Sequence, residues 1–459
     1  MLSSLARYYS VQSRRQIFRW ESVRCLSAQP RHLCPERQAR MEHIGEEVRK
    51  FREQEIVQRA SRREAYVQNM KHKALEKKVS PDCRPANVIV VGGGRMGEIR
   101  CEHVARSAKA RLVGFVDRDA STSARLASKH AGCEAFVRLE DAIDAMFEPI
   151  DVVWVCAPSP VHLSIITSAA EYGAHVAVEK PVAMTMDDIE DAYEVCDANG
   201  VYLSCAFQRR SDSAYIAVSD AVAHGDIGEP LSIRAVFRDH PGPPAAFLKD
   251  AGGDIFHDIA THDIDYILDL VKRRLAINAH LSNYNDSWFI NEGYRDVLTI
   301  EHMPNEVWAF GMSSTQELRQ AQVFDAATVV LKWTQANLCA TLDLSRSSAY
   351  GYDQRLEVFG SNGAAISVDN AKHATYTRAD SSGFNAGKLV HSFPQRFDTA
   401  FAHELDSFID CARGLASPKV TKHDALLATI VAEAAKRSAS FHSTVSLAPN
   451  EDGSVSLSL

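Results

Sequence analysis

The stretch VIVVGGGRMG at residues 88–97 carries the strongest fold signal in the chain. A run of β-branched residues ends in glycines, and Gly92, Gly94 and Gly97 have the G-x-G-x-x-G spacing that opens a helix. In a dinucleotide-binding turn, the first glycine permits the tight bend and the second lets a pyrophosphate approach the backbone. The third lets helix and strand pack closely. Glycine-rich turns are common, so the motif alone is weak evidence.

An acidic residue downstream strengthens this interpretation. The run RLVGFVD at residues 111–117 predicts a second buried strand, and it ends in Asp117, 20 residues after Gly97. A carboxylate there would hydrogen-bond both ribose hydroxyls of an adenosine, so we favour dinucleotide binding over a structural turn. Asp117 would repel the 2′-phosphate of NADP, whereas the neighbouring Arg118 could accept it. We therefore expect NAD, with NADP as the less favoured alternative.

Further predicted strands alternate with helices. Apolar runs at 151–158 and 175–181 are each trailed by a helical segment, and another run follows at 201–207. Strands that alternate with helices of roughly 10–15 residues are typical of βαβ units. This part of the chain therefore predicts an α/β domain with a parallel, doubly wound sheet.

Beyond about residue 230 the pattern changes. One helix is predicted over 252–270, and two more near 397–413 and 422–440. Between them, strand-like runs follow one another: LTIEHM (298–303), EVWAFGMSS (306–314), TVVLKW (328–333), ANLCATLDL (336–344), RLEVFG (355–360) and AAISVD (364–369). Several strands in succession predict a largely antiparallel sheet, and hence a second domain of the α+β class.

Composition excludes several classes of protein. The 459 residues contain no apolar run of the ~18 residues that a membrane span needs. Ten cysteines without a CxxC pair argue against a zinc ribbon and give no support to a disulfide scaffold. Residues 81–459 hold 33 basic and 50 acidic side chains, so nucleic acid is an unexpected partner for this part.

The N-terminal region differs from this acidic body. Residues 1–35 contain six Arg, six Ser and one acidic residue, the composition of a mitochondrial transit peptide; a disordered basic tail is the alternative. We expect a mitochondrial location in the first case and a cytoplasmic one in the second. Residues 36–85 read as a charged helical extension, and the prolines at 81 and 85 mark entry to the folded core.

Two segments carry candidate chemistry. Lys180, in Glu179-Lys180-Pro181 at the end of a predicted strand, could donate a hydrogen bond to an oxygen that gains negative charge; the plain alternative is a surface lysine. On the helix predicted over 252–270, Asp254, Asp258, His262 and Asp265 share one face. A histidine one turn from a carboxylate suits a general base with its orienting group. A solvated acidic face is one alternative. A metal site is another, but no distant His/Cys cluster completes it, so we expect no metal ligands.

Together these segments resemble the glucose–fructose oxidoreductase/inositol dehydrogenase (Gfo/Idh/MocA) superfamily, and its inositol dehydrogenases most closely. The resemblance covers about residues 86–448. Its markers are VVGGGRMG, the EKP tripeptide, FQRRSD (207–212), FRDHPGPP (237–244), GGDIFHDIATHDID and YGYDQRLEVFGSNG (350–363). It implies an NAD-binding Rossmann domain over 86–207 and a substrate and oligomerisation domain over 208–448 with an open-faced sheet, followed by a tail at 449–459. It also implies a homotetramer.

The resemblance further implies residue roles. Lys180, Asp258 and His262 would form the catalytic triad of a dehydrogenase that oxidises a polyol, most closely myo-inositol at its 2-hydroxyl, with NAD. His262 would take the hydroxyl proton, Lys180 would stabilise the alkoxide, and Asp258 would hold the histidine tautomer and help anchor the polyol. The expected substrate-binding residues are Lys180, Arg210, Asp239, Asp258, His262 and Tyr352. The expected cofactor-binding residues are Gly92, Gly94, Arg95, Met96, Gly97, Asp117, Arg118, Ala157, Pro158, His162, Glu179 and Lys180.

Two positions depart from the family pattern. Arg100 stands where a histidine is common, and His240 precedes the proline of RDHPGPP, which puts the exact substrate in doubt. Another sugar or polyol of the same superfamily is the first alternative substrate. A non-catalytic NAD-binding sensor is an alternative of a different class, and a metal-dependent hydrolase using the 254–265 face is a third.

Overall fold

The computed structural model describes residues 84–250, 253–279, 303–372, 377–381, 383–450 and 455–459, all of them in the compact unit 67–459. The expected transit peptide or basic tail at 1–35, nearly all of the charged extension at 36–85 and most of the predicted strand at 298–303 lie outside the described residues. The mitochondrial location therefore stays a prediction.

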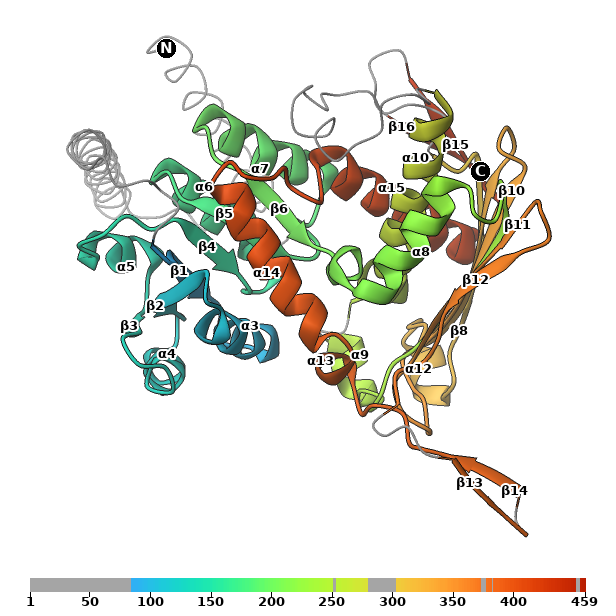
Figure 1. Ribbon diagram of the computed structural model, residues 1–459, viewed down its shortest axis with the longest axis horizontal. Coiled ribbons are helices and arrows are strands. Elements are labelled where there is room, and N and C mark those ends of the chain that lie inside the picture. The colour runs from blue at the N-terminus through green and yellow to red at the C-terminus, as the bar shows by residue number, and fades with distance from the viewer. Residues whose placement is uncertain (1–83, 251–252, 280–302, 373–376, 382, 451–454) are drawn as a thin grey trace, which may run out of the picture. The chain divides into compact units, whose positions relative to one another are not determined.

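Within the described residues, six parallel strands form the first sheet, in the order β3-β2-β1-β4-β5-β6 (Figure 1). They are β1 Ala86–Val91, β2 Ala110–Val116, β3 Glu134–Phe136, β4 Val152–Val155, β5 His175–Glu179 and β6 Leu203–Ala206. Every residue of β1 and β4 is buried, as expected of strands covered on both faces. The prediction of a doubly wound sheet is confirmed. It missed β3, which has three residues and no buried side chain.

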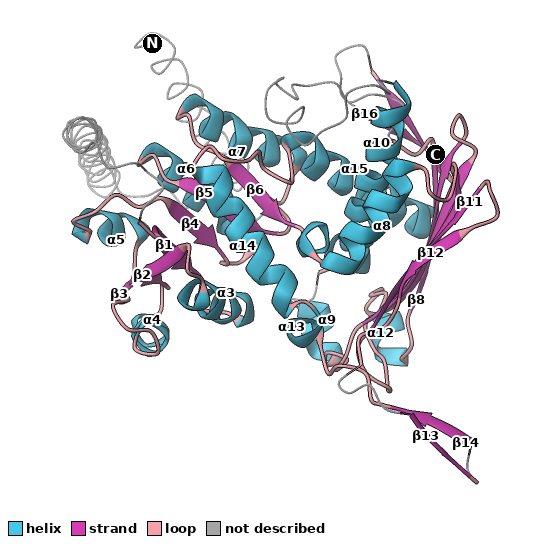
Figure 2. Ribbon diagram, viewed as in Figure 1, coloured by secondary structure: helices cyan, strands magenta, loops and turns pink. Residues whose placement is uncertain are grey.

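Helices connect and enclose these strands (Figure 2). They are α3 Arg95–Arg106, α4 Ala120–Ala127, α5 Leu139–Ala145, α6 His162–Glu171, which the short helix η3 Ser159–Val161 precedes, and α7 Met186–Ala198. Local sequence starts two of them. The Asp119 side chain caps α4 by accepting from the backbone N–H groups of Ser121 and Thr122, and Thr185 caps α7 in the same way.

The second sheet has eight strands within the described residues, in the order β12-β11-β7-β10-β9-β8-β15-β16. They are β7 Pro230–Arg238, β8 Glu306–Met312, β9 Ala326–Trp333, β10 Leu338–Ser345, β11 Asp353–Gly360, β12 Ala365–Val368, β15 Val445–Pro449 and β16 Val455–Ser458. Only β7 and β10 pair in parallel, so the sheet is mostly antiparallel, as predicted. Residues 455–458, expected in a tail, instead form its edge strand. A separate hairpin consists of β13 Thr377–Asp380 and β14 Gly383–Ala386.

Helices of the second domain are η4 Gln208–Ser211, α8 Ser213–His224, α9 Ala245–Asp250, η5 Phe256–Ala260, α10 Thr261–Ala279, α12 Gln316–Gln320, α13 Phe393–Arg396, α14 Asp398–Ala412 and α15 Lys422–Phe441. The single helix predicted over 252–270 is thus a π-helical turn, η5, that continues into α10. No described helix is both long and apolar enough to cross a membrane.

The helix α14 completes the core of the first domain. Its residues Leu405, Phe408 and Ile409 belong to the same buried cluster as Val88 of β1 and Trp154 of β4. The ring of Phe408 meets that of Trp154 edge to face, with centroids 6.3 Å apart. A segment that begins 192 residues after the end of β6 therefore supplies part of the apolar cover of the first sheet.

This packing predicts a large effect of one truncation. Phe408→Ala should lower the free energy of unfolding by about 3–5 kcal/mol, because it empties a buried site against Trp154. Urea denaturation followed by tryptophan fluorescence measures it. Phe147→Ala is the matched control, since Phe147 is 95% exposed and its loss should change stability little. Equal stability of the two variants would contradict the assigned role of α14.

Candidate active site

The glycine-rich turn between β1 and α3 is sterically determined. Gly92 has φ of +108°, and a Cβ there would lie 2.5 Å from the backbone nitrogen of Ala157. A Cβ on Gly97 would overlap the carbonyl oxygen of Gly92. Both positions therefore require glycine, one for the bend and one for the close approach of helix to strand.

The second glycine leaves space for a ligand. A Cβ on Gly94 would meet nothing within 4 Å, and no side chain caps the start of α3. At the end of β2, Asp117 Oδ2 accepts from the N–H of Gly93 at 2.6 Å, and Oδ1 accepts from the N–H of Asp119 at 2.9 Å. Arg118 beside it is exposed. An open helix N-terminus with a fixed carboxylate nearby fits the pyrophosphate and ribose of a dinucleotide.

The loops after β4 and β5 are joined by a buried histidine. His162 Nε2 lies 2.7 Å from the carbonyl oxygen of Ala157, and Nδ1 lies 2.9 Å from that of Pro181. These loops stand at the carboxyl edge of the first sheet, where ligands of such folds bind. His162 thus fixes the loop that contains Ala157 and Pro158 against the loop that follows Lys180.

A cavity of about 480 Å³ opens at this edge. It is lined by Arg95, Met96, Cys156, Ala157, Pro158, Ser159, His162, Glu179, Lys180, Gln208, Phe237, Asp239, Phe247, Asp258, Ile259, His262, Tyr352, Phe393 and Phe401. The structure thus brings Lys180, Asp258 and His262 together with Asp239 and Tyr352, from four segments of sequence. The predicted cofactor residues outside this lining, Gly92, Gly94, Gly97, Asp117 and Arg118, form the neighbouring glycine-rich turn and the end of β2.

Asp258 is held between two cations. Its Oδ1 accepts from Lys180 Nζ at 2.6 Å, and its Oδ2 accepts from Arg346 NH1 at 2.6 Å. Lys180 Nζ also donates to the main-chain oxygen of Asp258 at 2.8 Å. Burial alone would raise the pKa of Asp258, but the charges of Lys180 and Arg346 hold it well below its usual range. The carboxylate therefore stays ionised, and its function is to place Lys180.

His262 is half-buried, and its imidazole is neutral. Burial, with the charges of Lys180 and Arg209, holds the pKa of His262 well below its usual value. Its Nδ1 has no hydrogen-bond partner, and its ring packs edge-on against Phe207 and Phe237, at 6.1 and 6.4 Å between centroids. A neutral imidazole that lines this pocket suits a proton acceptor.

The expected contact from Asp258 to His262 does not form. Both Asp258 oxygens bind the cations described above, and the two residues share no hydrogen bond. The physical reason is the π-helical turn η5, whose i→i+5 bonding changes the spacing that an α-helix would impose on positions 258 and 262. Packing, and not a carboxylate, holds the histidine ring.

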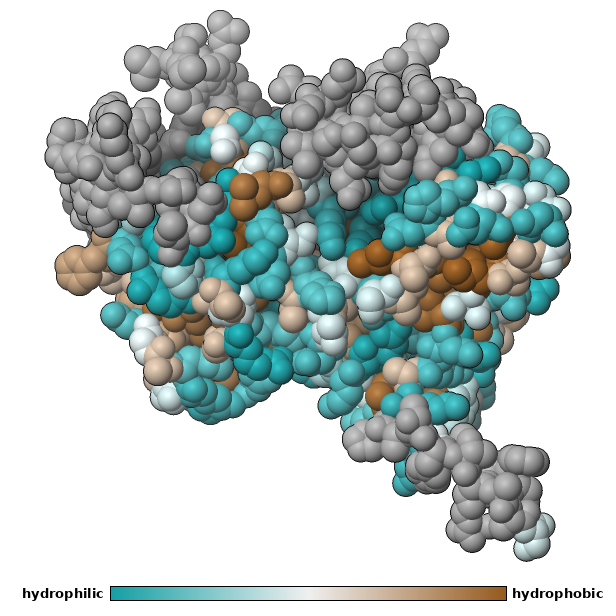
Figure 3. Space-filling model, in the orientation of Figure 1, coloured by the Kyte–Doolittle hydropathy of each residue, from teal (hydrophilic) through white to brown (hydrophobic). Residues whose placement is uncertain are grey.

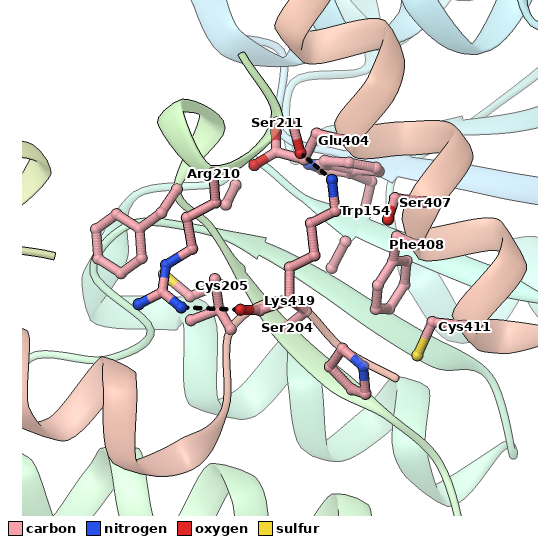
Figure 4. Close-up of a pocket in the computed structure, with 15 residues that line it drawn as sticks. Trp154, Ser204, Cys205, Arg210, Ser211, Glu404, Ser407, Phe408, Cys411 and Lys419 are labelled. Carbon is pink, nitrogen blue, oxygen red and sulfur yellow. Dashed lines mark hydrogen bonds between the residues drawn. The ribbon is translucent and has the colours of Figure 1, made fainter. Parts of the chain in front are cut away.

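The expectation that Arg210 binds substrate is also wrong. Arg210 is buried outside the 480 Å³ cavity, and its guanidinium donates to the carboxylates of Asp265, Asp269 and Asp424. It also donates to the main-chain oxygen of Lys419, the contact that Figure 4 draws. It instead lines a separate space of about 20 Å³, with room for about one water molecule. With its donors taken by buried acceptors, Arg210 has a structural role.

Arg100, the departure from the family histidine, is buried behind the pocket. Its guanidinium bridges Glu179 and Glu404, at 2.7 Å from each, and lies over the rings of Trp154 and Phe401. Burial raises the pKa of Glu404 to about 7, against the opposing charge of Arg100. Arg100 thereby fixes Glu179, the residue before Lys180, beneath the site.

The second departure stands at the edge of the pocket. His240 Nδ1 donates to the carbonyl oxygen of Ser348 at 2.7 Å, and its ring packs edge-on against His391, 4.9 Å between centroids. The preceding residue, Asp239, lines the pocket, and burial raises its pKa, with a contribution from the charge of Asp258. His240 therefore fixes the backbone next to a candidate substrate ligand.

Sequence reasoning missed two polar residues of the site. Gln208, buried at the start of η4, lines the pocket beside Lys180, and Arg346 binds Asp258. Gln208 stands inside the FQRRSD marker and Arg346 four residues before YGYD, so both were near quoted motifs. Among the described residues, no group of three or more His, Cys, Asp or Glu side chains is arranged to hold a metal ion.

Comparison with known proteins identifies the family. The model of the oxidoreductase family with an NAD-binding Rossmann fold (GFO/IDH/MocA) matches residues 86–207, and that of the GFO/IDH/MocA C-terminal domain matches residues 215–366. The chain is 29% identical to inositol 2-dehydrogenase of Rhizobium meliloti over 360 residues, which cover 78% of this chain and 98% of the relative. It is 28% identical to scyllo-inositol 2-dehydrogenase (NAD(+)) of Bacillus subtilis, covering 76% and 92% of the two chains.

Solved structures agree. The crystal structure of a myo-inositol dehydrogenase from Corynebacterium glutamicum superimposes with a TM-score of 0.68 at 25% identity, covering 80% of this chain and all of that one. The two sheets, the glycine-rich turn and the pocket described above are therefore features of a known architecture. The chain belongs to the Gfo/Idh/MocA family of NAD-dependent oxidoreductases.

Proposed function

We propose that this enzyme oxidises a secondary hydroxyl of a cyclic polyol, with myo-inositol as the first candidate substrate, giving the 2-keto inositol. The observation that carries the proposal is the meeting of Lys180, Asp258 and His262 in one pocket at the carboxyl edge of the first sheet. The named relatives are described as dehydrogenases of inositol, scyllo-inositol and myo-inositol, which supports the same substrate class. scyllo-Inositol is the second candidate.

The residues of the pocket have separate roles in the proposed reaction. Neutral His262 takes the hydroxyl proton, because its depressed pKa leaves the imidazole free to accept one. Lys180, placed by Asp258, donates to the oxygen as it becomes an alkoxide. NAD, when bound, accepts the hydride from the same carbon. Asp239 and the carboxamide of Gln208 lie in the pocket, where they would pair with further ring hydroxyls.

The substrate assignment predicts a specific activity. Purified protein should form NADH, followed by absorbance, with myo-inositol, and should do so faster than with scyllo-inositol or hexoses; NADP should support a slower reaction than NAD. The carboxylate of Asp117 is the physical reason for the cofactor preference. Absence of turnover with every polyol, while NAD still binds, would contradict the proposed reaction and favour a sensor.

The base assignment predicts a second result. His262→Asn should lower kcat by about 10²–10⁴-fold and leave NAD binding unchanged, because it removes the proton acceptor but no cofactor contact. His257→Asn is the matched control. His257 stands on the π turn that precedes α10, but it binds Asp254 and does not line the pocket, so this variant should keep its activity. Wild-type turnover by His262→Asn would remove the histidine from the mechanism.

The cofactor turn predicts a contrast between two glycines. Gly97→Ala should abolish NAD binding, because its Cβ would overlap the Gly92 carbonyl oxygen and displace α3. Gly94→Ala has free space in the protein itself, so it should keep wild-type stability and still weaken NAD binding, since its Cβ projects where the pyrophosphate would lie. Calorimetric titration with NAD and thermal melting separate the two effects. Unchanged NAD affinity of Gly94→Ala would place the pyrophosphate elsewhere.

We also propose that the chain forms a homo-oligomer through the outer face of the second sheet. On β8, the alternate residues Trp308, Phe310 and Met312 are each at least 40% exposed, and Phe359 of β11 is 40% exposed. Figure 3 views this sheet from its β12 edge, where further hydrophobic surface lies near α8 and β12. Neighbouring exposed apolar side chains, such as the three on β8, are typical of protein interfaces. The tetramer implied by the family resemblance would use this face.

Charged substitutions on this face test the oligomer. The double variant Trp308→Glu and Phe310→Lys should sediment as a smaller species than the wild type, because charge is costly in an apolar interface. Analytical ultracentrifugation measures the change. A wild-type protein that sediments as a monomer would contradict the proposal, and so would an unchanged oligomer of the variant.

A further inference from the structure

Arg346 lies just beyond the end of β10 and is almost completely buried, with a relative side-chain exposure of 4%. NH1 donates to Asp258 Oδ2 at 2.6 Å, and NH2 donates to the carbonyl oxygen of Gly253 at 3.0 Å. The backbone N–H of Arg346 donates to the carbonyl oxygen of Asp325 at 2.8 Å. One guanidinium therefore fixes both the Asp258 carboxylate and the backbone that leads into the π turn carrying it.

Arg346 does not line the 480 Å³ pocket, so any effect on the reaction passes through Asp258. Lys180 and Asp258 alone would form a pair without net charge. A neutral pair would stabilise a developing alkoxide less well than a free ammonium group does. Arg346 supplies a second positive charge on the far oxygen of Asp258, so the three groups together carry a net charge of +1.

We propose that Arg346 is a positioning residue of the dehydrogenase reaction: it clamps Asp258 and offsets its charge, so that Lys180 presents a positive charge to the reacting oxygen. The proposal rests on the proposed function, because it assumes that an alkoxide develops beside Lys180. It assigns a role to a side chain of the second sheet that touches neither substrate nor cofactor.

The charge of Arg346 also affects the pKa of His262. The charged groups that face this imidazole are Lys180 after β5, Arg209 of η4 and Asp258 of the π turn. Arg209 is itself paired with Asp263. Without Arg346, the charge of Asp258 would be less compensated, and a more negative surrounding favours the protonated imidazole. The pKa of His262 would rise, and since only neutral His262 accepts a proton, the acid limb of the pH–rate profile would move to higher pH.

The test compares Arg346→Gln, Arg346→Lys and a control, Arg396→Gln. Arg396 is also buried, 8% exposed, and binds one carboxylate, that of Asp212, at 2.6 Å outside the pocket. We expect Arg346→Gln to lose about 10–100-fold in kcat, to keep its NAD affinity and to shift its acid limb upward. Arg346→Lys keeps the charge, so it should keep the wild-type acid limb and recover most of the rate.

A purely structural role would give a different result. Arg346→Gln would then resemble Arg396→Gln, with a lower melting temperature and a wild-type pH profile, and Arg346→Lys would rescue nothing; either outcome overturns the proposal.

A measurement without substrate separates this inference from the proposed function. Diethyl pyrocarbonate modifies neutral histidine, and peptide mass spectrometry reports the modification of His262 at each pH in the NAD-free and NAD-bound enzyme. The midpoint is the pH at which the rate of His262 modification is half of its maximum. In Arg346→Gln this midpoint should lie at higher pH than in wild type and Arg396→Gln. If no polyol is oxidised but the midpoint moves, the proposed function fails and the charge assignment to Arg346 stands. If the midpoint is the same in Arg346→Gln as in wild type, the charge effect assigned to Arg346 is ruled out, whatever the substrate.

Discussion

A single carboxylate connects the parts of this enzyme that make its active site. Asp258 binds Lys180 from the edge of the first sheet and Arg346 from the second, while itself belonging to the helix between them. Each oxygen of Asp258 is paired with one of these two cations. Displacement of any of the three segments would break an ion pair. The same two ion pairs therefore fix both the geometry of the site and the relative positions of its three segments.

Two adjacent arginines extend this arrangement behind the pocket. Arg209 pairs with Asp263 and Arg210 with Asp265, so η4 is bound to the first turns of α10 by buried ion pairs. His262 directly precedes Asp263, and its ring is enclosed by Phe207 and Phe237. These contacts explain how the histidine keeps its place without a hydrogen bond from a carboxylate. They also explain why Arg210, which reads as a polyol ligand in the sequence, is unavailable to one.

Much of the fold could be predicted because its signals are local. The strands β1, β2, β4, β5 and β6 are short buried runs, and Gly97 is fixed by a steric contact with Gly92 in the same turn. The partners of Asp258 could not be found this way. Arg346 is 88 residues away from it, and the π turn is invisible to a pattern that assumes α-helical spacing. The exposed strand β3 has no apolar pattern at all. Helical periodicity located His262 and Asp258 but assigned them to each other, whereas Asp258 pairs with two cations and packing holds the ring of His262.

The return of α14 to the first sheet has a consequence for the order in which the protein can be made. Ribosomes add about 5–20 residues per second, and the roughly 200 residues between β6 and α14 take on the order of 10–40 s to synthesise. During that interval the nascent first domain carries an uncovered apolar groove around Trp154, because Leu405, Phe408 and Ile409 do not yet exist. The first domain therefore lacks part of its core until the end of the chain has been made. Binding by a chaperone would matter most during this interval.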